Sequence, residues 1–160
     1  MKEKYPVTMA TRLLRERKAE YEPKLYKYED KGGTAVSARE LGVDEHYVIK
    51  TIIMEDDTKE PFIVLMHGDM SISEKNMARI RGVKTVKPCL PATADKHSGY
   101  MVGGTSPFGT KRPMKVYIEK TILSLDKIYI NGGKRGFLIV IKPSVLTDIL
   151  DWQAVEVAYN

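Results

Sequence analysis

The chain has 160 residues, 42% of them hydrophobic and 29% charged, with a formal net charge of +5 and a sequence pI of about 9.2. These values predict one globular domain over residues 1–160 and argue against a disordered or fibrous protein. The single cysteine, Cys89, excludes an internal disulfide and fits a reducing, cytoplasmic setting. The apolar runs are strand-sized, so neither a membrane span nor a signal peptide is expected.

The first part of the chain predicts two helices separated by an extended segment. Apolar residues at helical spacing predict a helix over 8–20, with Thr8 as its N-cap. Its cluster of arginines and a lysine indicates either a solvated face or a surface that contacts RNA. Tyrosines that alternate with charges predict a strand or extended segment over 21–28, and residues 34–41 predict a short helix.

The stretch 47–54 predicts a strand that is apolar on both faces, which is typical of a strand in the middle of a sheet. Lys50 is the charged residue within it. A buried amine costs desolvation free energy unless it reaches a cleft or an anion, so Lys50 is a candidate functional residue. The alternative is an edge strand, from which the lysine extends along its apolar stem to solvent.

Most of the remaining strands are expected in hairpins. One hairpin joins 47–54 to 61–67, and a second joins 127–130 to 137–141. The other expected elements are a helix at 71–81 capped by Ser71 and Glu74, a strand at 83–87, one or two helical turns at 91–97, a strand at 115–118 and a helix at 143–150. Together they predict a single-domain α/β fold, with a mixed, mostly antiparallel, barrel-like sheet flanked by helices.

The segment 99–111 is the least ordinary local sequence, because it combines four glycines, a proline and the adjacent hydroxyls of Thr105 and Ser106. Glycines let a backbone approach a ligand closely, so the segment is either a ligand-binding loop or a simple connecting turn. A phosphate-binding P-loop is excluded, because Thr110 stands where the motif requires lysine. A second glycine turn, 131–136, contains a lysine and an arginine.

The residue spacing gives little support for a metal site or for a catalytic nucleophile. The three histidines, His46, His67 and His97, lack metal-ligand spacing with one another or with Cys89, so no metal site is expected. Cys89 lies in an expected connection, which favours a buried or incidental thiol over a nucleophile. Lys50 and the two glycine loops remain, and they would suit a phosphate-bearing ligand with an electrophilic carbon.

Several segments in this order resemble the YbaK family of aminoacyl-tRNA deacylases, which is related to the editing insertion domain of bacterial prolyl-tRNA synthetase. They are Thr34–Ala38, Tyr47–Thr51, Gly99–Gly109 and Ile128–Gly136. The resemblance extends over nearly the whole chain. It is greatest to the freestanding branch that clears cysteine mischarged on proline tRNA.

The resemblance implies a single α/β domain that hydrolyses, in trans, the ester joining a wrong amino acid to tRNA, with Cys-tRNA(Pro) as the expected substrate. Lys50 matches the family's essential lysine, Gly103 matches the glycine that borders the aminoacyl pocket, and Tyr28 lies where the family has a pocket tyrosine. No metal or cofactor is expected. In cysteine-clearing members the substrate's own thiol attacks the ester, so no protein nucleophile is needed.

The residue chemistry and the resemblance together predict a wider site. The expected substrate-binding residues are Tyr28, Gly103, Gly104, Thr105, Ser106, Asn131, Gly132 and Gly133. The residues expected to hold tRNA phosphates are Lys111, Lys134 and Arg135. The expected partners are the aminoacylated 3′ end of tRNA and prolyl-tRNA synthetase.

Two positions depart from the pattern of the cysteine-clearing members. Asn131 stands where they have serine, and Leu138 replaces an aspartate that follows their glycine turn. Both changes alter polar groups near the pocket, so they bear on the choice of amino acid more than on the fold or the reaction. Two alternatives stay open: a non-catalytic module that binds tRNA or a synthetase, and an enzyme whose substrate is not tRNA.

Overall fold

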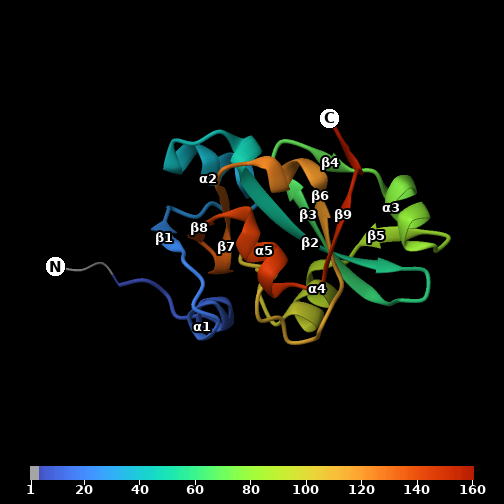
Figure 1. Ribbon diagram of the computed structural model, residues 1–160, viewed down its shortest axis with the longest axis horizontal. Helices are drawn as coiled ribbons and strands as arrows, with labels where there is room; N and C mark the ends of the chain where they lie inside the picture. The colour runs from blue at the N-terminus through green and yellow to red at the C-terminus, as the bar shows by residue number, and fades with distance from the viewer. Residues whose placement is uncertain (1–3) are drawn as a thin grey trace.

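The computed structural model describes residues 4–160 and contains an eight-stranded mixed sheet with helices packed around it (Figure 1). The strands are β1 (Glu22–Leu25), β2 (Val48–Asp56), β3 (Pro61–His67), β5 (Val86–Pro88), β6 (Val116–Glu119), β7 (Ile128–Lys134), β8 (Phe137–Ile141) and β9 (Trp152–Val155), with β4 (Ser71–Ile72) and β10 (Ala158–Tyr159) in a separate pair. The helices are α1 (Met9–Glu16), α2 (Gly33–Leu41), α3 (Glu74–Arg81), α4 (Pro91–Ser98) and α5 (Pro143–Ile149), with the 3-10 helices η1 (Glu45–Tyr47) and η2 (Lys120–Ser124).

The strands of the main sheet follow the order β1-β8-β7-β2-β3-β6-β9, and β5 pairs with β2 outside this path. The expected hairpins are present as the antiparallel pairs β2–β3 and β7–β8. The pairs β2–β7, β3–β6 and β6–β9 are parallel, so the prediction of a mixed sheet is confirmed. Within the described chain the end strands β1 and β9 do not pair with each other, so the sheet is open and does not close into a barrel.

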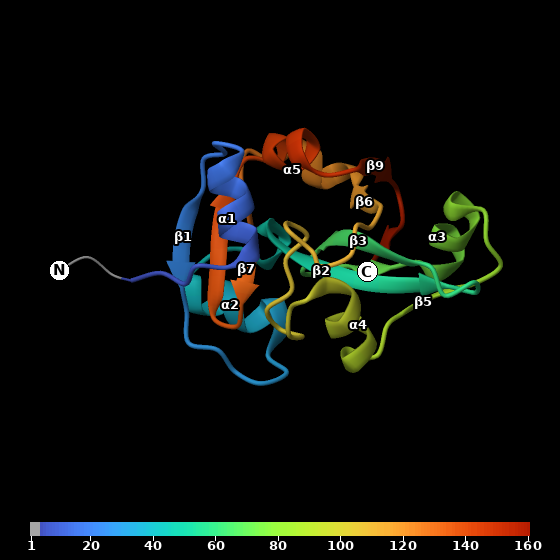
Figure 2. The ribbon, with the colours of Figure 1, turned by 90° about the horizontal axis from the view of Figure 1, so that it is seen from below.

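Strand β2 is the central strand that the sequence predicts, and it crosses the middle of the molecule between the α1 end and the α3 end (Figure 2). Its side chains Ile49 and Ile53 enter the largest apolar cluster, whereas Met54 enters a second cluster beneath α3. β2 pairs with β3 on one side and with β7 and β5 at its two ends on the other, so Lys50 lies on an interior strand of the sheet.

The sheet splits along one edge of β2. Strand β7 pairs with β2 only at Val48 and Ile49, and β5 pairs with it only from Met54 onward. Residues 50–53 therefore have no strand partner on that side. Because β7 diverges from β2 at this point, the fold leaves a gap in the middle of an otherwise continuous sheet.

The element boundaries show where local signals succeed and where they fail. Thr8 caps α1 as predicted, because its side chain accepts a hydrogen bond from the Thr11 N–H. The helix predicted over 71–81 begins only at Glu74, with Ser73 as its N-cap, so the assignment of Ser71 as the cap is wrong. Ser71 instead lies in β4, which pairs with β10 near the chain end. This long-range pairing competes with the local helix signal.

Candidate functional site

A cavity of about 560 Å³ occupies the gap beside β2. Its walls come from the β1–α2 connection, α2, β2, the β5–α4 connection, the 99–111 loop and the β7–β8 hairpin. Of the residues predicted from the sequence to form the site, the cavity is lined by Tyr28, Lys50, Gly103, Thr105, Asn131 and Arg135. Segments far apart in the sequence thus meet at one concave surface, which is the usual form of a small-molecule or cofactor site.

Lys50 lies on β2 opposite Met66 of β3, and its side chain is half-buried. Burial lowers the pKa of the Lys50 amine, because a low-dielectric wall disfavours the charged form. The carboxylates of Glu45 and Asp69 act in the opposite direction and favour the ammonium. The cavity therefore contains a partly desolvated cation whose charge is supported by two nearby acids.

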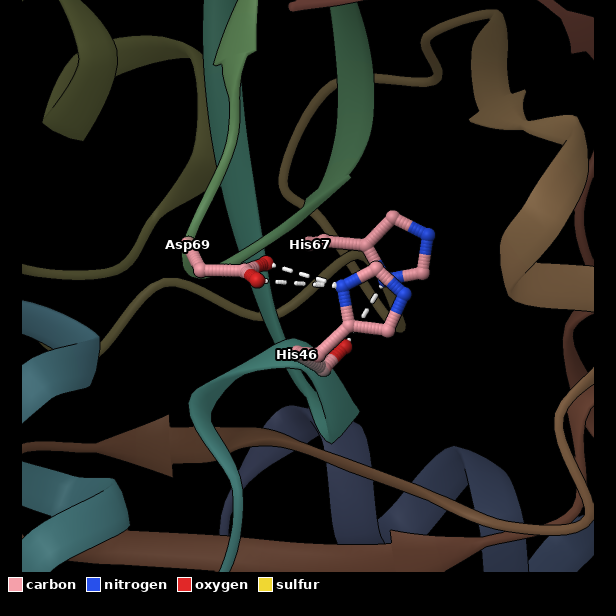
Figure 3. Close-up of side chains that lie close together, drawn as sticks. All are labelled: His46, His67 and Asp69. Carbon is pink, nitrogen blue, oxygen red and sulfur yellow. Dashed lines mark hydrogen bonds and ion pairs between the residues drawn. The ribbon is translucent and has the colours of Figure 1, made fainter. Parts of the chain in front are cut away.

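Asp69 also anchors a histidine cluster beside this site, formed by His46, His67 and Asp69 (Figure 3). His46 Nδ1 lies 3.0 Å from a carboxylate oxygen of Asp69, and its ring stacks on His67 with centroids 3.7 Å apart. His67 Nδ1 lies 2.8 Å from the His46 carbonyl oxygen, which can only accept, so this nitrogen carries a proton. His67 Nε2 lies 2.7 Å from Thr121 Oγ1, and burial lowers the pKa of His67, so the ring is neutral.

The histidine cluster is built as a hydrogen-bonded support. Its two rings are parallel within 5°, so their in-plane lone pairs run side by side and do not converge on one point. Both ring nitrogens of His67 already have partners. We conclude that the cluster positions Asp69, and through it the electrostatic environment of Lys50.

Gly103 is placed against Tyr28 in the cavity wall. Its φ of +92° lies in the left-handed region, and a Cβ built there would come within 2.6 Å of the Tyr28 hydroxyl. The N–H groups of Gly103 and Thr105 donate to no partner within residues 4–160. The Gly104 N–H, in contrast, donates to the Met101 carbonyl at 2.8 Å. The loop thus offers two free backbone donors on the lining of the cavity.

Two side chains of the β7–β8 hairpin tie it to the 99–111 loop. The Asn131 side-chain amide donates to the Gly103 carbonyl at 3.0 Å, and its oxygen accepts from the Gly133 and Lys134 N–H groups. Arg135 Nε donates to the Val102 carbonyl at 2.9 Å, while its guanidinium lies 5.2 Å from the centre of the Tyr28 ring. These contacts fix the spacing of the two loops at the cavity mouth.

The other predicted site residues lie outside the cavity wall. Three of them are glycines that close packing requires. A Cβ at Gly104 would contact the backbone of Lys134 and Arg135. A Cβ at Gly132 would contact the Phe137 ring, and a Cβ at Gly133 would contact the Thr8 side chain. Ser106 is fully buried, and its hydroxyl accepts from the Phe108 N–H. Lys111 and Lys134 are exposed on the surface of the two loops.

Many further residues line the cavity that the sequence did not single out as ligand contacts, among them Thr51, Cys89 and Leu138. Thr51 Oγ1 is the buried side-chain polar atom that has no hydrogen-bond partner in the described part of the chain. Leu138 is buried against Val48 and Tyr129, so it presents an apolar wall. Alternation along β2 places the Thr51 side chain on the face opposite Lys50, beside Ile49 and Ile53, so the sequence offered no signal for it.

The backbone of Thr51 also faces the gap. The Val48 carbonyl accepts a hydrogen bond from the Gly68 N–H on the β3 side of the strand. The Ile53 carbonyl accepts one from the Cys89 N–H on the opposite side. Because backbone groups alternate in direction along a strand, the N–H and C=O of Thr51 point toward the gap, as those of Ile53 do. The open edge of β2 thus adds main-chain donors and acceptors to the cavity.

Comparison with known proteins assigns the whole arrangement to one family. The model of the aminoacyl-tRNA editing domain matches residues 29–149, which include the cavity-lining segments of β2 and both loops. The chain belongs to the aminoacyl-tRNA editing domain family. By this membership it is an aminoacyl-tRNA deacylase, a hydrolase of the aminoacyl ester.

Relatives and solved structures agree with this assignment. EbsC of Enterococcus faecalis, assigned as a Cys-tRNA(Pro)/Cys-tRNA(Cys) deacylase, is 24% identical over 94% of this chain and 92% of its own length. A proline–tRNA ligase of Brachyspira hyodysenteriae is 27% identical over 54% of this chain, which corresponds to 15% of the ligase. The same fold occurs in the crystal structure of the hypothetical protein APE2540, with a TM-score of 0.86, 22% identity and coverage of 94% and 99% of the two chains.

A second solved structure, assigned as a trans-editing enzyme for prolyl-tRNA synthetase, superposes with a TM-score of 0.82 at 16% identity over 98% of this chain and all of that one. These comparisons confirm the predicted family resemblance and the α/β fold. Among the described residues, no helix is both long and apolar enough to cross a membrane.

Proposed function

We propose that the protein acts in trans on tRNA(Pro) mischarged with cysteine, and that the cavity beside β2 binds the aminoacylated 3′ end. One observation carries this proposal: half-buried Lys50 lines the same cavity as Gly103 and Thr105, whose N–H groups have no partner within residues 4–160. An ester carbonyl that gains negative charge needs donors of this kind, held in place before the reaction begins.

The size and lining of the cavity suit an aminoacyl-adenosine. A volume of about 560 Å³ lies within the range of small-ligand sites, and most of the wall is apolar with a few polar groups. The Thr51 hydroxyl is buried without a partner, so a ligand group that bonds to it would remove an energetic cost. We therefore assign Thr51 a role in contacting the substrate.

In the proposed reaction the substrate supplies its own nucleophile. The cysteine thiol loses its proton and attacks the ester carbonyl carbon, the bond from that carbon to the ribose oxygen breaks, and the ribose oxygen takes up a proton. Water then opens the resulting cyclic thioester to free cysteine. Lys50 and the Gly103 and Thr105 amides stabilise the negative charge on the carbonyl oxygen during the attack.

The thiol of Cys89 is a poor substitute for this nucleophile. Burial, reinforced by Glu55, raises the pKa of the Cys89 thiol to about 11, so it is protonated at neutral pH. Its N–H pairs with Ile53, three residues along β2 from Lys50. At about 3.3 Å per residue, the backbone partner of Cys89 lies about 10 Å along β2 from Lys50.

The exposed cations of the two glycine loops fit the phosphates that lead to the 3′ end. Arg135 lines the cavity, while Lys111 and Lys134 project from the two loops beside it. Such contacts make tRNA binding fall steeply with salt. We further propose that the enzyme works beside prolyl-tRNA synthetase in the cytoplasm, where the mischarged tRNA arises.

The deciding experiment is a deacylation assay with Cys-, Ala- and Ser-charged tRNA(Pro), with Pro-tRNA(Pro) and Cys-tRNA(Cys) as references. We expect multiple turnovers with Cys-tRNA(Pro) and at least ~100-fold slower hydrolysis by Lys50→Ala, the loss typical of removing an oxyanion-stabilising group. Lys75→Ala on α3 is the matched control, because this exposed lysine lies away from the cavity.

Three results would contradict parts of the proposal. Binding without turnover would indicate a non-catalytic module. Hydrolysis of Ala-tRNA(Pro) that is faster than that of Cys-tRNA(Pro) would show that alanine is the preferred amino acid, in keeping with the apolar wall at Leu138. Undiminished hydrolysis by Lys50→Ala would remove the role given to that amine.

A further inference from the structure

Three side chains with metal-ligating atoms meet next to the part of the cavity wall that Cys89 contributes. His97 Nε2 is 2.8 Å from Glu55 Oε2, and Cys89 lies beside this pair, with one donor atom of each residue within 4.8 Å of the others. We propose that Glu55, Cys89 and His97 form a binding site for a divalent transition-metal ion with affinity for thiolate, of which Zn²⁺ is the reference case.

The backbone holds each of these residues in place. Glu55 pairs with Lys87 where β5 joins β2, and Cys89 follows β5 directly, with its N–H donating to the Ile53 carbonyl at 2.9 Å. His97 lies in the last turn of α4, where its carbonyl accepts from the Arg112 N–H at 3.1 Å. The three ligands therefore come from three anchored segments, so binding an ion would require little reordering of the backbone.

The chemistry of the donors suits such an ion. A thiolate, an imidazole and a carboxylate are ligands that Zn²⁺ accepts in tetrahedral sites, and three protein ligands leave a fourth position open. Cys89 lines the cavity, so this position can be filled from the cavity side by water. With the thiol deprotonated, the two anions and a neutral imidazole carry a charge of −2, which a divalent cation balances.

A divalent ion would also balance the charges of the deprotonated cluster. Glu55 is one cause of the raised pKa of Cys89, since two anions side by side in a partly buried place repel each other. Without an ion the thiol keeps its proton and has no hydrogen-bond partner within residues 4–160. Binding of the ion would displace that proton, so affinity should rise about tenfold per pH unit below the thiol pKa.

The site is separate from the proposed ester chemistry. Glu55 and Lys50 are five residues apart on β2, or about 16 Å at 3.3 Å per residue. An ion there would instead fix the cavity wall made by Pro88, Cys89, Pro91 and Ala94. The proposal therefore does not depend on which ester, if any, the cavity binds.

The test uses the reduced, tag-free chain after treatment with a chelator. Co²⁺ is titrated in and the near-ultraviolet charge-transfer band of a Co²⁺–thiolate bond is followed, and Zn²⁺ is then added to displace Co²⁺. Cys89 is the single cysteine of the chain, so a thiolate band reports on this residue alone. We expect one ion per chain, a band that Zn²⁺ abolishes, and binding that strengthens with pH.

Variants then assign the other ligands. Cys89→Ser should remove the band, and His97→Gln and Glu55→Gln should each weaken Co²⁺ binding by at least ~10-fold. His46→Gln is the matched control, because it removes a histidine from the other cluster, and it should leave the affinity unchanged. Circular dichroism of each ion-free variant checks that it is folded.

The proposal is overturned if the wild-type protein gives no thiolate band at millimolar Co²⁺. It is also overturned if binding survives both Cys89→Ser and His97→Gln, or if His46→Gln weakens binding more than His97→Gln does. The wild-type spectrum decides thiolate ligation even if a variant fails to fold.

Discussion

The side-chain amide of Asn131 donates to the carbonyl oxygen of Gly103 at 3.0 Å, and this bond joins the two glycine loops across the mouth of the cavity. The same side chain accepts hydrogen bonds from Gly133 and Lys134, so it also shapes the bulge at the end of β7. Asn131 was predicted to bind substrate, but both the N–H₂ and the oxygen of its side-chain amide form hydrogen bonds within the protein.

The substitution Asn131→Asp separates the hydrogen bond that Asn131 donates from the two that it accepts. The carboxylate keeps the acceptor for Gly133 and Lys134 but loses the donor to Gly103 and faces its carbonyl. We expect a loss of about 1 kcal/mol in the free energy of unfolding, the net worth of one hydrogen bond, together with a larger KM from loosened loops. Denaturant titration and steady-state deacylation measure the two effects. An unchanged KM would show that the loops keep their spacing without this bond.

The contact between Gly103 and Tyr28 can be tested by a double-mutant cycle. Gly103→Ala places a Cβ 2.6 Å from the Tyr28 hydroxyl and forces alanine to a φ of +92°, so hydrolysis should fall at least ~10-fold. In Tyr28→Phe the hydroxyl is gone and the nearest ring atoms are 3.2 Å away, so the double variant should recover part of the loss. Strictly additive effects in the cycle would mean that the loss comes from backbone strain alone.

Lys50 is expected to lower the stability of the protein while supporting activity. Burial lowers its pKa in the folded state, so between that pKa and 10.5 the unfolded chain binds more protons and the free energy of unfolding rises with pH. Lys50→Met should therefore be more stable than the wild type at neutral pH, and this advantage should shrink as the pH rises through that window. Thermal melts across the alkaline range test the sign, and a less stable variant at pH 7 would contradict it.

The ion pair of Asp56 and Arg81 should matter for stability and for acid resistance. Burial alone would raise the pKa of Asp56, but hydrogen bonds from Thr58 and Arg81 outweigh it and lower the pKa from 3.8 to about 2. The stabilisation is present above pH 3.8 and is lost as the pH falls toward 2. Asp56→Ala should cost about 3 kcal/mol at pH 7, because it leaves a partly buried guanidinium unpaired.

Denaturant titrations at pH 7 and near pH 2 check this prediction, since the difference from the wild type should be much smaller at the lower pH. Asp126→Ala serves as the control, because the Asp126 carboxylate is exposed and has neither an ion pair nor a hydrogen bond among the described residues.

The local patterns of the sequence predicted the elements that depend on nearby residues. Continuous apolar runs located β2 and β8, and Thr8 marked the start of α1. The lone charge of Lys50 on a strand with two buried faces was enough to predict that it faces a cleft. These signals work over a few residues, and they fail where a distant segment competes, as at Ser71, which pairs with β10.

The parts that the sequence could not predict all depend on contacts between distant segments. The parallel pairs β3–β6 and β6–β9 join strands separated by long connections, and β9 itself carries no strong local strand signal. The spacing of His97 and Cys89 argued against a metal site, yet β5 and α4 bring both of them beside Glu55. The loop glycines look alike in sequence, but only the packing shows that Gly104 and Gly132 serve close contacts.

The overlap of β2 and β7 is only two residue pairs long, and its length sets the width of the gap beside β2. Lengthening that overlap by one pair would draw β7 along β2 and narrow the space beside Thr51, while shortening it would widen the space, with no change to the residues that line it. We therefore expect changes at this strand junction, which directly precedes Lys50, to alter the size of the amino acid that the cavity accepts.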